Sequence, residues 1–194
     1  LQILKKLKNF LKVIEQQTHE DYEKKYKKLN LSKIKGETTL ILSGSGKISG
    51  CVLRILEQLK HVKPRILYIK ADLSTSDNTA KLRDRAVFGV LQEYARSNLL
   101  SALYVFSNDM VEGLLGGISL TSYWQEINNL ISSTYNMLLY FEKTEPLLNS
   151  LSSETITSKV AAPGIVNYSD LSEKMLYDIK SPRHKKYFFC ISDK

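Results

Sequence analysis

The sequence predicts an α/β fold: a Rossmann-like parallel sheet flanked by helices, with a long central helix that leads into the start of a second α/β domain. Three short apolar runs, at 38–42, 65–71 and 99–106, alternate with amphipathic stretches at 51–60 and 79–96. This alternation is typical of parallel strands joined by helices. Ligands of such folds bind at the carboxyl ends of the strands, so the loops there are the expected site.

The long helix is predicted by apolar residues that recur at helical spacing after Ser119, which we expect to cap it. Pro146 is expected to end or kink this helix. Further along, residues 170–179 are predicted to be helical, with Asp170 and Glu173 at capping-box spacing. Residues 186–192 are predicted to form a last strand.

The composition is that of a globular chain: 43% of the 194 residues are hydrophobic, enough to fill a core. No apolar run is long enough to span a membrane, and no secretory signal is visible. Cys51 and Cys190 have no spacing that suggests a disulfide framework or a metal site. We therefore expect a cytoplasmic protein without a bound structural metal.

Positive charge gathers at the N-terminus. Residues 1–35 hold ten lysines and four acidic residues, which accounts for +6 of the chain's net charge of +8. Apolar residues at helical spacing predict a basic amphipathic helix over 2–17. The simplest interpretation is a solvated lysine face, and the alternative is a docking element for a larger protein assembly. The lack of arginine–aromatic interleaving disfavours nucleic acid as a partner.

The segment Gly44-Ser45-Gly46-Lys47-Ile48-Ser49-Gly50 lies between a predicted strand and a predicted helix. A glycine-rich turn at this place directs backbone N–H groups and the positive end of a helix toward one point, which suits a phosphate group. By itself this pattern is weak, because small residues also form tight turns that bind nothing.

Together with three later segments, this turn resembles the tubulin/FtsZ family. Gly44–Gly50 resembles the family's phosphate-binding signature GGGTGSG. Asp77 and Lys81 fall where FtsZ has a Glu and an Arg near the ribose and phosphates. The segment 105–109 resembles the FtsZ segment VIPND, whose Asn lies near the nucleotide and matches Asn108.

The third of these later segments, 123–132, resembles the tubulin segment TYGDLNHLVS, in which an aromatic ring stacks on guanine and an Asn bonds to its edge. The matching residues, Trp124 and Asn128, are four apart and share one helix face. Trp124 could equally be a core residue. The resemblance implies bound GTP or GDP, with Mg²⁺ as a further candidate, held by Gly44, Ser45, Gly46, Lys47, Ser49, Gly50, Asp77, Lys81, Asn108, Trp124 and Asn128.

A fifth segment, 163–170, resembles the FtsZ stretch PGLINLDFAD, a loop that enters the neighbouring subunit's nucleotide site. The resemblance makes Asp170 and Glu173 the candidate catalytic acids, one residue out of register. A tubulin-length alignment would instead place the loop at Asn149, with Glu154 as the acid. The resemblance thus implies head-to-tail self-association, with hydrolysis where subunits meet.

Several departures keep alternatives open. In the signature, Lys47 replaces Thr and Ile48 replaces Gly, and a β-branched residue disfavours a left-handed turn. Lys47 either supplies charge to a phosphate or points to solvent. The family's first phosphate loop has no counterpart in this sequence. The alternatives to a cytoskeletal GTP-binding protein are a non-hydrolysing interaction subunit and an unrelated α/β domain.

Four segments are expected from these patterns. They are a basic helix and linker (1–35), a partial nucleotide-binding α/β domain (36–118), the long helix with a Ser/Thr-rich segment (119–160), and the acidic-loop region that opens the second domain (161–194).

Overall fold

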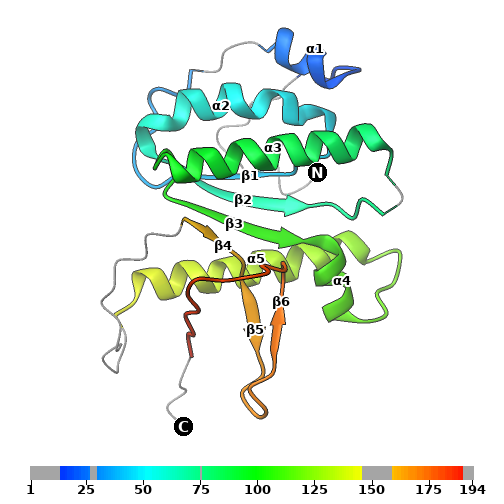
Figure 1. The fold of residues 1–194 in the computed structure, drawn as a ribbon, viewed down its shortest axis with the longest axis vertical. Coiled ribbons are helices and arrows are strands. Elements are labelled where there is room, and N and C mark those ends of the chain that lie inside the picture. The colour runs from blue at the N-terminus through cyan, green and yellow to red at the C-terminus, as the bar shows by residue number, and fades with distance from the viewer. Residues whose placement is uncertain (1–13, 27–29, 75, 146–158, 190–194) are drawn as a thin grey trace.

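The computed structural model describes residues 14–26, 30–74, 76–145 and 159–189. At its centre is a parallel sheet in the order β1-β2-β3-β4 (Figure 1). The strands are β1 (Thr39–Leu42), β2 (Arg65–Lys70), β3 (Ala102–Ser107) and β4 (Val160–Ala161). Helices occupy the connections, so the predicted α/β class is confirmed.

One face of the sheet is covered by helices from the first two connections. The turn η2 (Lys47–Cys51) leads into α2 (Val52–Leu59), which ends in η3 (Lys60–Val62), and α3 (Asn78–Arg96) follows β2. Alternate strand residues face these helices because side chains of a strand point to opposite faces in turn. The core on this side includes Leu56, Ile66, Tyr68, Leu91, Leu103 and Val105.

The opposite face is covered by α4 (Asn108–Leu115) and α5 (Tyr123–Lys143). Its core includes Leu67, Phe106, Val111, Ile127 and Ile131. The helix α5 runs antiparallel to the strands (Figure 1). Its C-terminal half bonds to the amino ends of the strands, where Glu142 Oε2 accepts a hydrogen bond of 2.6 Å from Arg65 Nη2. The N-terminal turn of α5 therefore lies toward the carboxyl edge of the sheet.

A short helix, α1 (His19–Lys24), rests on η2 and α2. Thr18 caps it by accepting the backbone N–H of Asp21 at 3.1 Å. Its buried Tyr22 accepts a hydrogen bond on its carbonyl from Cys51 Sγ at 3.3 Å. A basic helix was predicted over 2–17. Residues 1–13 lie outside the described residues, and residues 14–17 are not helical.

The region after the long helix differs from the prediction. Residues 170–179 do not form a helix; β5 (Gly164–Val166) and β6 (Glu173–Met175) form an antiparallel hairpin. The supposed capping pair is a tight turn instead, in which Asp170 Oδ1 accepts the backbone N–H of Ser172 at 3.0 Å. Residues 186–189 are not in a strand, and 190–192 lie outside the described residues.

Two further predictions were wrong in detail. The segment after β3, expected as a glycine-loosened loop, is the helix α4, with Gly113 inside it. The long helix begins at Tyr123, with Ser122 at its N-cap, three residues later than the start expected from a cap at Ser119. Ser119 instead shares a hydrogen bond of 2.9 Å with Thr121.

Candidate functional site

The glycine-rich loop connects β1 to α2 at the carboxyl edge of the sheet (Figure 1). All of its residues are described, and none has a positive φ. Ile48 lies in η2, where an ordinary helical backbone suffices, so it does not strain the turn. The side chain of Lys47 is exposed. The loop is thus a 3₁₀ entry into α2 rather than a left-handed cradle of N–H groups.

Two of the loop's glycines are required by packing. A Cβ at Gly44 would overlap the hydroxyl of Tyr68, and a Cβ at Gly50 would overlap the carbonyl oxygen of His19 in α1. At Gly46 the nearest atom to an added Cβ is 3.9 Å away, in ordinary contact. The glycine spacing at the ends of the segment is therefore explained by its neighbours without any ligand.

The loop is held by its own serines and by one arginine of α3. The buried Ser49 Oγ donates to the Gly44 carbonyl at 3.0 Å. The hydroxyls of Ser43 and Ser45 lie 3.3 Å apart. From α3, Arg83 Nε donates to the Ser45 carbonyl at 3.2 Å. Side chains of two elements therefore fix the loop's backbone.

Beside the loop lies a buried polar cluster. Asp84 of α3 uses both of its carboxylate oxygens. Its Oδ1 accepts a hydrogen bond of 2.7 Å from Tyr68 Oη, and its Oδ2 forms an ion pair of 2.7 Å with Lys70 Nζ. Lys70 Nζ also lies 4.8 Å from the ring centroid of Phe88. Burial, and then the hydrogen bond to Asp84, raise the pKa of Tyr68 well above its usual range. This tyrosine is therefore a neutral donor.

Sequence reasoning missed Arg83 and Asp84. A signal was present: Asp84 lies three residues before Val87 and seven before Leu91, both buried on the core stripe of α3. A carboxylate on an apolar stripe needs a partner, which predicts a buried pair.

The second predicted segment follows β2. Asp77 caps α3 by accepting the backbone N–H of Ala80 at 2.6 Å on its side chain. Lys81 is exposed, and its backbone N–H donates to the Asp77 carbonyl at 3.2 Å. The local helix-cap interpretation accounts for Asp77, and Lys81 remains open to solvent at the same edge.

The third segment follows β3, where Asn108 opens α4. Asn108 is 7% exposed, and its Oδ1 is buried without a hydrogen-bond partner. An unpaired buried amide oxygen costs about 1–3 kcal/mol. Before it, the backbone N–H of Ser107 donates to the Leu176 carbonyl at 2.7 Å, and the Ser107 hydroxyl bonds to Asp109. Asn108 is thus a strand-end residue whose amide is not satisfied locally.

The fourth segment is the N-terminal turn of α5. Trp124 is 64% exposed, so it is not a core residue, and Asn128 one turn later is also exposed. The Trp124 ring meets Tyr123 edge to face, with centroids 5.1 Å apart. Tyr123 in turn donates to Glu112 of α4 at 2.7 Å. The indole and the amide therefore stand on an accessible helix face, and the indole is braced by an aromatic neighbour.

The two candidate acids lie on the hairpin. Hydrogen bonds from Ser172 lower the pKa of Asp170, and bonds from Lys185 and then Tyr187 lower the pKa of Glu173. Both side chains are carboxylates that can orient a water molecule by accepting its hydrogen bonds. Neither is tuned toward the neutral pKa that suits a general base.

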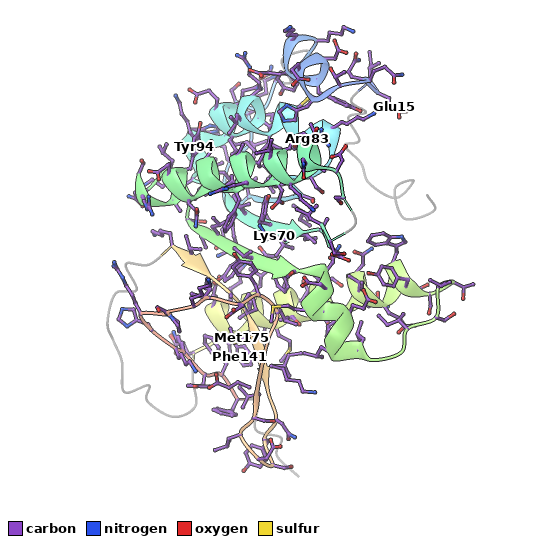
Figure 2. All side chains as sticks on the ribbon, turned by 45° about the vertical axis from the view of Figure 1, so that its right-hand side comes forward. Glu15, Lys70, Arg83, Tyr94, Phe141 and Met175 are labelled. Atoms are coloured by element: carbon purple, nitrogen blue, oxygen red, sulfur yellow. The ribbon has the colours of Figure 1, made fainter. Side chains whose placement is uncertain are left out.

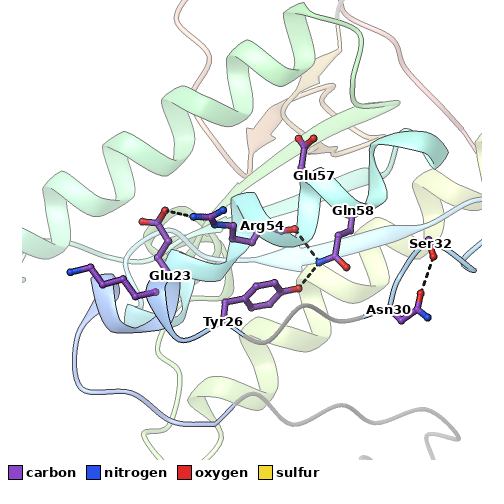
Figure 3. Close-up of a pocket in the computed structure, with 8 residues that line it drawn as sticks. Glu23, Tyr26, Asn30, Ser32, Arg54, Glu57 and Gln58 are labelled. Carbon is purple, nitrogen blue, oxygen red and sulfur yellow. Dashed lines mark hydrogen bonds and ion pairs between the residues drawn. The ribbon is translucent and has the colours of Figure 1, made fainter.

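Two hollows of the described structure lie away from the glycine-rich loop. An open groove of about 830 Å³ separates α1 from α2, and in it Arg54 pairs with Glu23 while Gln58 bonds to Tyr26 (Figure 3). A hollow of about 180 Å³ lies at the amino ends of the strands, beside Arg65. No residue of the glycine-rich loop lines either of these two hollows.

The described residues contain neither a cluster of metal ligands nor a helix that could span a membrane. Within the described ranges, no group of three His, Cys, Asp or Glu side chains is arranged to hold a metal ion. No helix in the described part of the chain is both long and apolar enough to cross a membrane.

Comparison with known proteins adds no relative: no family model, no curated protein and no solved structure matches this chain.

Proposed function

We propose that this chain is part of a tubulin/FtsZ-like, guanine-nucleotide-binding protein of the cytoplasm, which assembles head to tail into filaments. The nucleotide would lie across the carboxyl edge of the sheet. Its phosphates would face the loop after β1, and its base would face the N-terminal turn of α5.

One observation carries this proposal: four segments matched to the family, spread over more than 80 residues, meet at a single edge. The glycine-rich loop, Asp77 and Asn108 follow three adjacent parallel strands. Neighbouring strands are about 4.8 Å apart, so the loops after β1 and β3 are separated by about 10 Å. A mononucleotide can bridge that distance.

The chemistry of the base end also supports guanine. An exposed indole offers a flat stacking surface, worth about 1–3 kcal/mol for a nucleic-acid base. Asn128 lies one helical turn from Trp124 and offers both a donor and an acceptor to a purine edge. The unpaired Asn108 Oδ1 marks a second amide that a small side-chain movement would offer to a ligand donor.

The hairpin supports assembly. Its base is anchored by Leu176, which is buried in the second core, while the β5–β6 turn projects away from the body (Figure 1). Tyr168 and Leu171 at this turn are 84% and 65% exposed. Exposed apolar residues on a projecting loop favour insertion into another subunit. A contact between two different surfaces of the same chain gives filaments when it does not close.

A second candidate is a non-hydrolysing interaction subunit of a larger assembly. What favours it is that the expected catalytic and phosphate-binding features have local roles: Gly44 and Gly50 are packing residues, and Asp170 and Glu173 have partners within the hairpin region. Docking would then use α1 and the basic segment before it.

The base site is tested with guanine nucleotides and the protein's single tryptophan. GTP and GDP should change the Trp124 fluorescence in a saturable way. Asn128→Ala should weaken binding about 10-fold, as expected for a lost pair of hydrogen bonds. Asn129→Ala is the matched control, because Asn129 is exposed on a different face of α5. No fluorescence change up to millimolar nucleotide would refute guanine binding.

Hydrolysis is tested separately, by phosphate release under conditions that allow assembly. If the first candidate is correct, Asp170→Ala should slow release only when subunits associate, and Asp178→Ala, which removes another exposed aspartate, should not. Equal release by the wild type and Asp170→Ala would reject the catalytic assignment of Asp170, and no release by the wild type would favour the non-hydrolysing candidate.

A further inference from the structure

We propose that Arg83 of α3 is the residue that binds the phosphate groups of the nucleotide, in the place expected for the lysine of the glycine-rich loop. The inference rests on the proposed function for the identity of the nucleotide. The anion site itself is argued from the geometry of Arg83 alone.

The guanidinium of Arg83 is anchored at one point. Its Nε donates to the Ser45 carbonyl at 3.2 Å, which ties α3 to the loop after β1. Figure 2 shows Arg83 on the N-terminal half of α3 and Lys70 near the end of β2. A guanidinium held through Nε keeps its plane fixed, and its two terminal nitrogens remain free to donate in parallel. This fork matches two oxygens of one phosphate.

The charge of Arg83 is not neutralised by a neighbour. In the part of the chain that the structure describes, no carboxylate forms an ion pair with it. The adjacent Asp84 is unavailable, because Tyr68 and Lys70 occupy its two oxygens. A half-buried guanidinium with no carboxylate partner is unusual unless a bound anion balances its charge.

The alternatives at this edge are less suited. The side chains of Lys47 and Lys81 are exposed and have no contact that fixes their position. A lysine ammonium is a strongly hydrated point charge on a flexible stem, whereas the arginine is already ordered. Both lysines add positive potential around the site and so help to attract an anion.

A ligand preference follows. The two hydroxyls of Ser43 and Ser45 lie 3.3 Å apart on the same loop, next to the carbonyl that anchors Arg83. Because Arg83 meets the loop after β1, two strands away from β3, it would contact the phosphates furthest from a base that is bound at α5. Di- and triphosphates should depend on Arg83, and nucleosides should not.

The experiment compares Arg83→Ala and Arg83→Lys with Arg85→Ala, an exposed arginine on the same helix that points about 160° away. Binding of GTP, GDP, guanosine and inorganic pyrophosphate is measured by titration calorimetry, and circular dichroism checks the fold. Arg83→Ala should weaken GTP, GDP and pyrophosphate about 10- to 100-fold, the effect of losing a charged hydrogen bond, and leave guanosine unchanged. Arg83→Lys should recover only part of this loss, and Arg85→Ala should match the wild type.

The results separate the two proposals. If Arg83→Ala binds pyrophosphate and GTP as the wild type does, or loses guanosine to the same degree as GTP, the Arg83 site is overturned while guanine binding can stand. If the wild type binds pyrophosphate through Arg83 but not guanosine or its nucleotides, the anion site stands and the guanine proposal fails. If the wild type binds none of the four, both are overturned.

Discussion

Replacing Gly44 by alanine is expected to destabilise the fold by about 2–3 kcal/mol. The added Cβ would overlap the Tyr68 hydroxyl and lie 3.0 Å from Asp84 Cα in α3. Overpacking of this kind costs about 1–3 kcal/mol. Moving the hydroxyl away would also break its 2.7 Å bond to Asp84, which adds about 1 kcal/mol. The lower entropy of unfolded alanine offsets less than about 1 kcal/mol of this.

The assay is urea unfolding followed by circular dichroism, with thermal unfolding beside it. For a chain of 194 residues, this loss corresponds to a fall in Tm of about 4–12 °C. Gly46→Ala is the matched control in the same loop, because its Cβ would have 3.9 Å of clearance, and it should stay within about 0.5 kcal/mol of the wild type.

A double-mutant cycle identifies the clash. Tyr68→Phe removes the hydroxyl and should cost about 1 kcal/mol by itself, because Asp84 loses a donor. Gly44→Ala combined with Tyr68→Phe should then be more stable than the sum of the two single changes predicts, by at least about 0.5 kcal/mol. The reasoning is refuted if the two effects simply add, or if Gly44→Ala unfolds at the same urea concentration as the wild type.

Three further outcomes are expected. Gly50→Ala should displace α1, so that a thiol reagent modifies Cys51 faster, measured by mass spectrometry of its peptide; unchanged labelling would contradict the role of Gly50. Because the pKa of Tyr68 is raised in the fold, its stability contribution is complete below about pH 10, where the unfolded tyrosine begins to ionise, and declines progressively as the pH rises toward the folded-state pKa. The urea midpoint should therefore fall more steeply from about pH 10 to 11 in the wild type than in Tyr68→Phe. Lys70→Met should cost about 3 kcal/mol in urea unfolding, since it leaves the buried Asp84 carboxylate without its cation; a loss below 1 kcal/mol would show that the pair is not buried in solution.

The sequence was most informative where periodicity and burial agree. The strands β1, β2 and β3 and the helix α3 lie within a few residues of their predicted positions, because each strand is a short apolar run and the helix has a regular apolar stripe. The helix α4 was missed because Gly113 suggested a loop, whereas packing of Val111 against the sheet overrides that local preference.

The hairpin shows why local patterns were insufficient. Asp170 and Glu173 have the spacing of a helix cap, but the same short side chains also close tight turns. The choice is made by Leu176, which is buried in the second core, and by Leu171, whose φ of 55° no helix would accept. The burial of Leu176 depends on contacts with segments distant in sequence, whereas the turn at Leu171 is closed locally by a bond of 2.8 Å from its backbone N–H to the Asn167 carbonyl.

In the candidate site, too, some features follow from the sequence and others arise only in the folded chain. The parallel order of β1, β2 and β3 brings the segments after them to one edge of the sheet, and Trp124 is exposed on α5. Arg83 could not be found from a motif, because its partner Ser45 lies 38 residues away in the sequence. Its contact with Ser45 is a property of the assembled fold.

The contact between Gly50 and His19 links the N-terminal region to the loop in energetic terms. Gly50 in η2 packs directly against the backbone of α1. Any partner that displaces α1 therefore also changes the conformational free energy of the glycine-rich loop, which ends in η2. Thermodynamic linkage makes this relation reciprocal: a ligand that orders the loop must change the affinity of that partner by the same factor. Gly50 therefore connects two surfaces, and a mutation at this position would alter the communication between them as well as their stability.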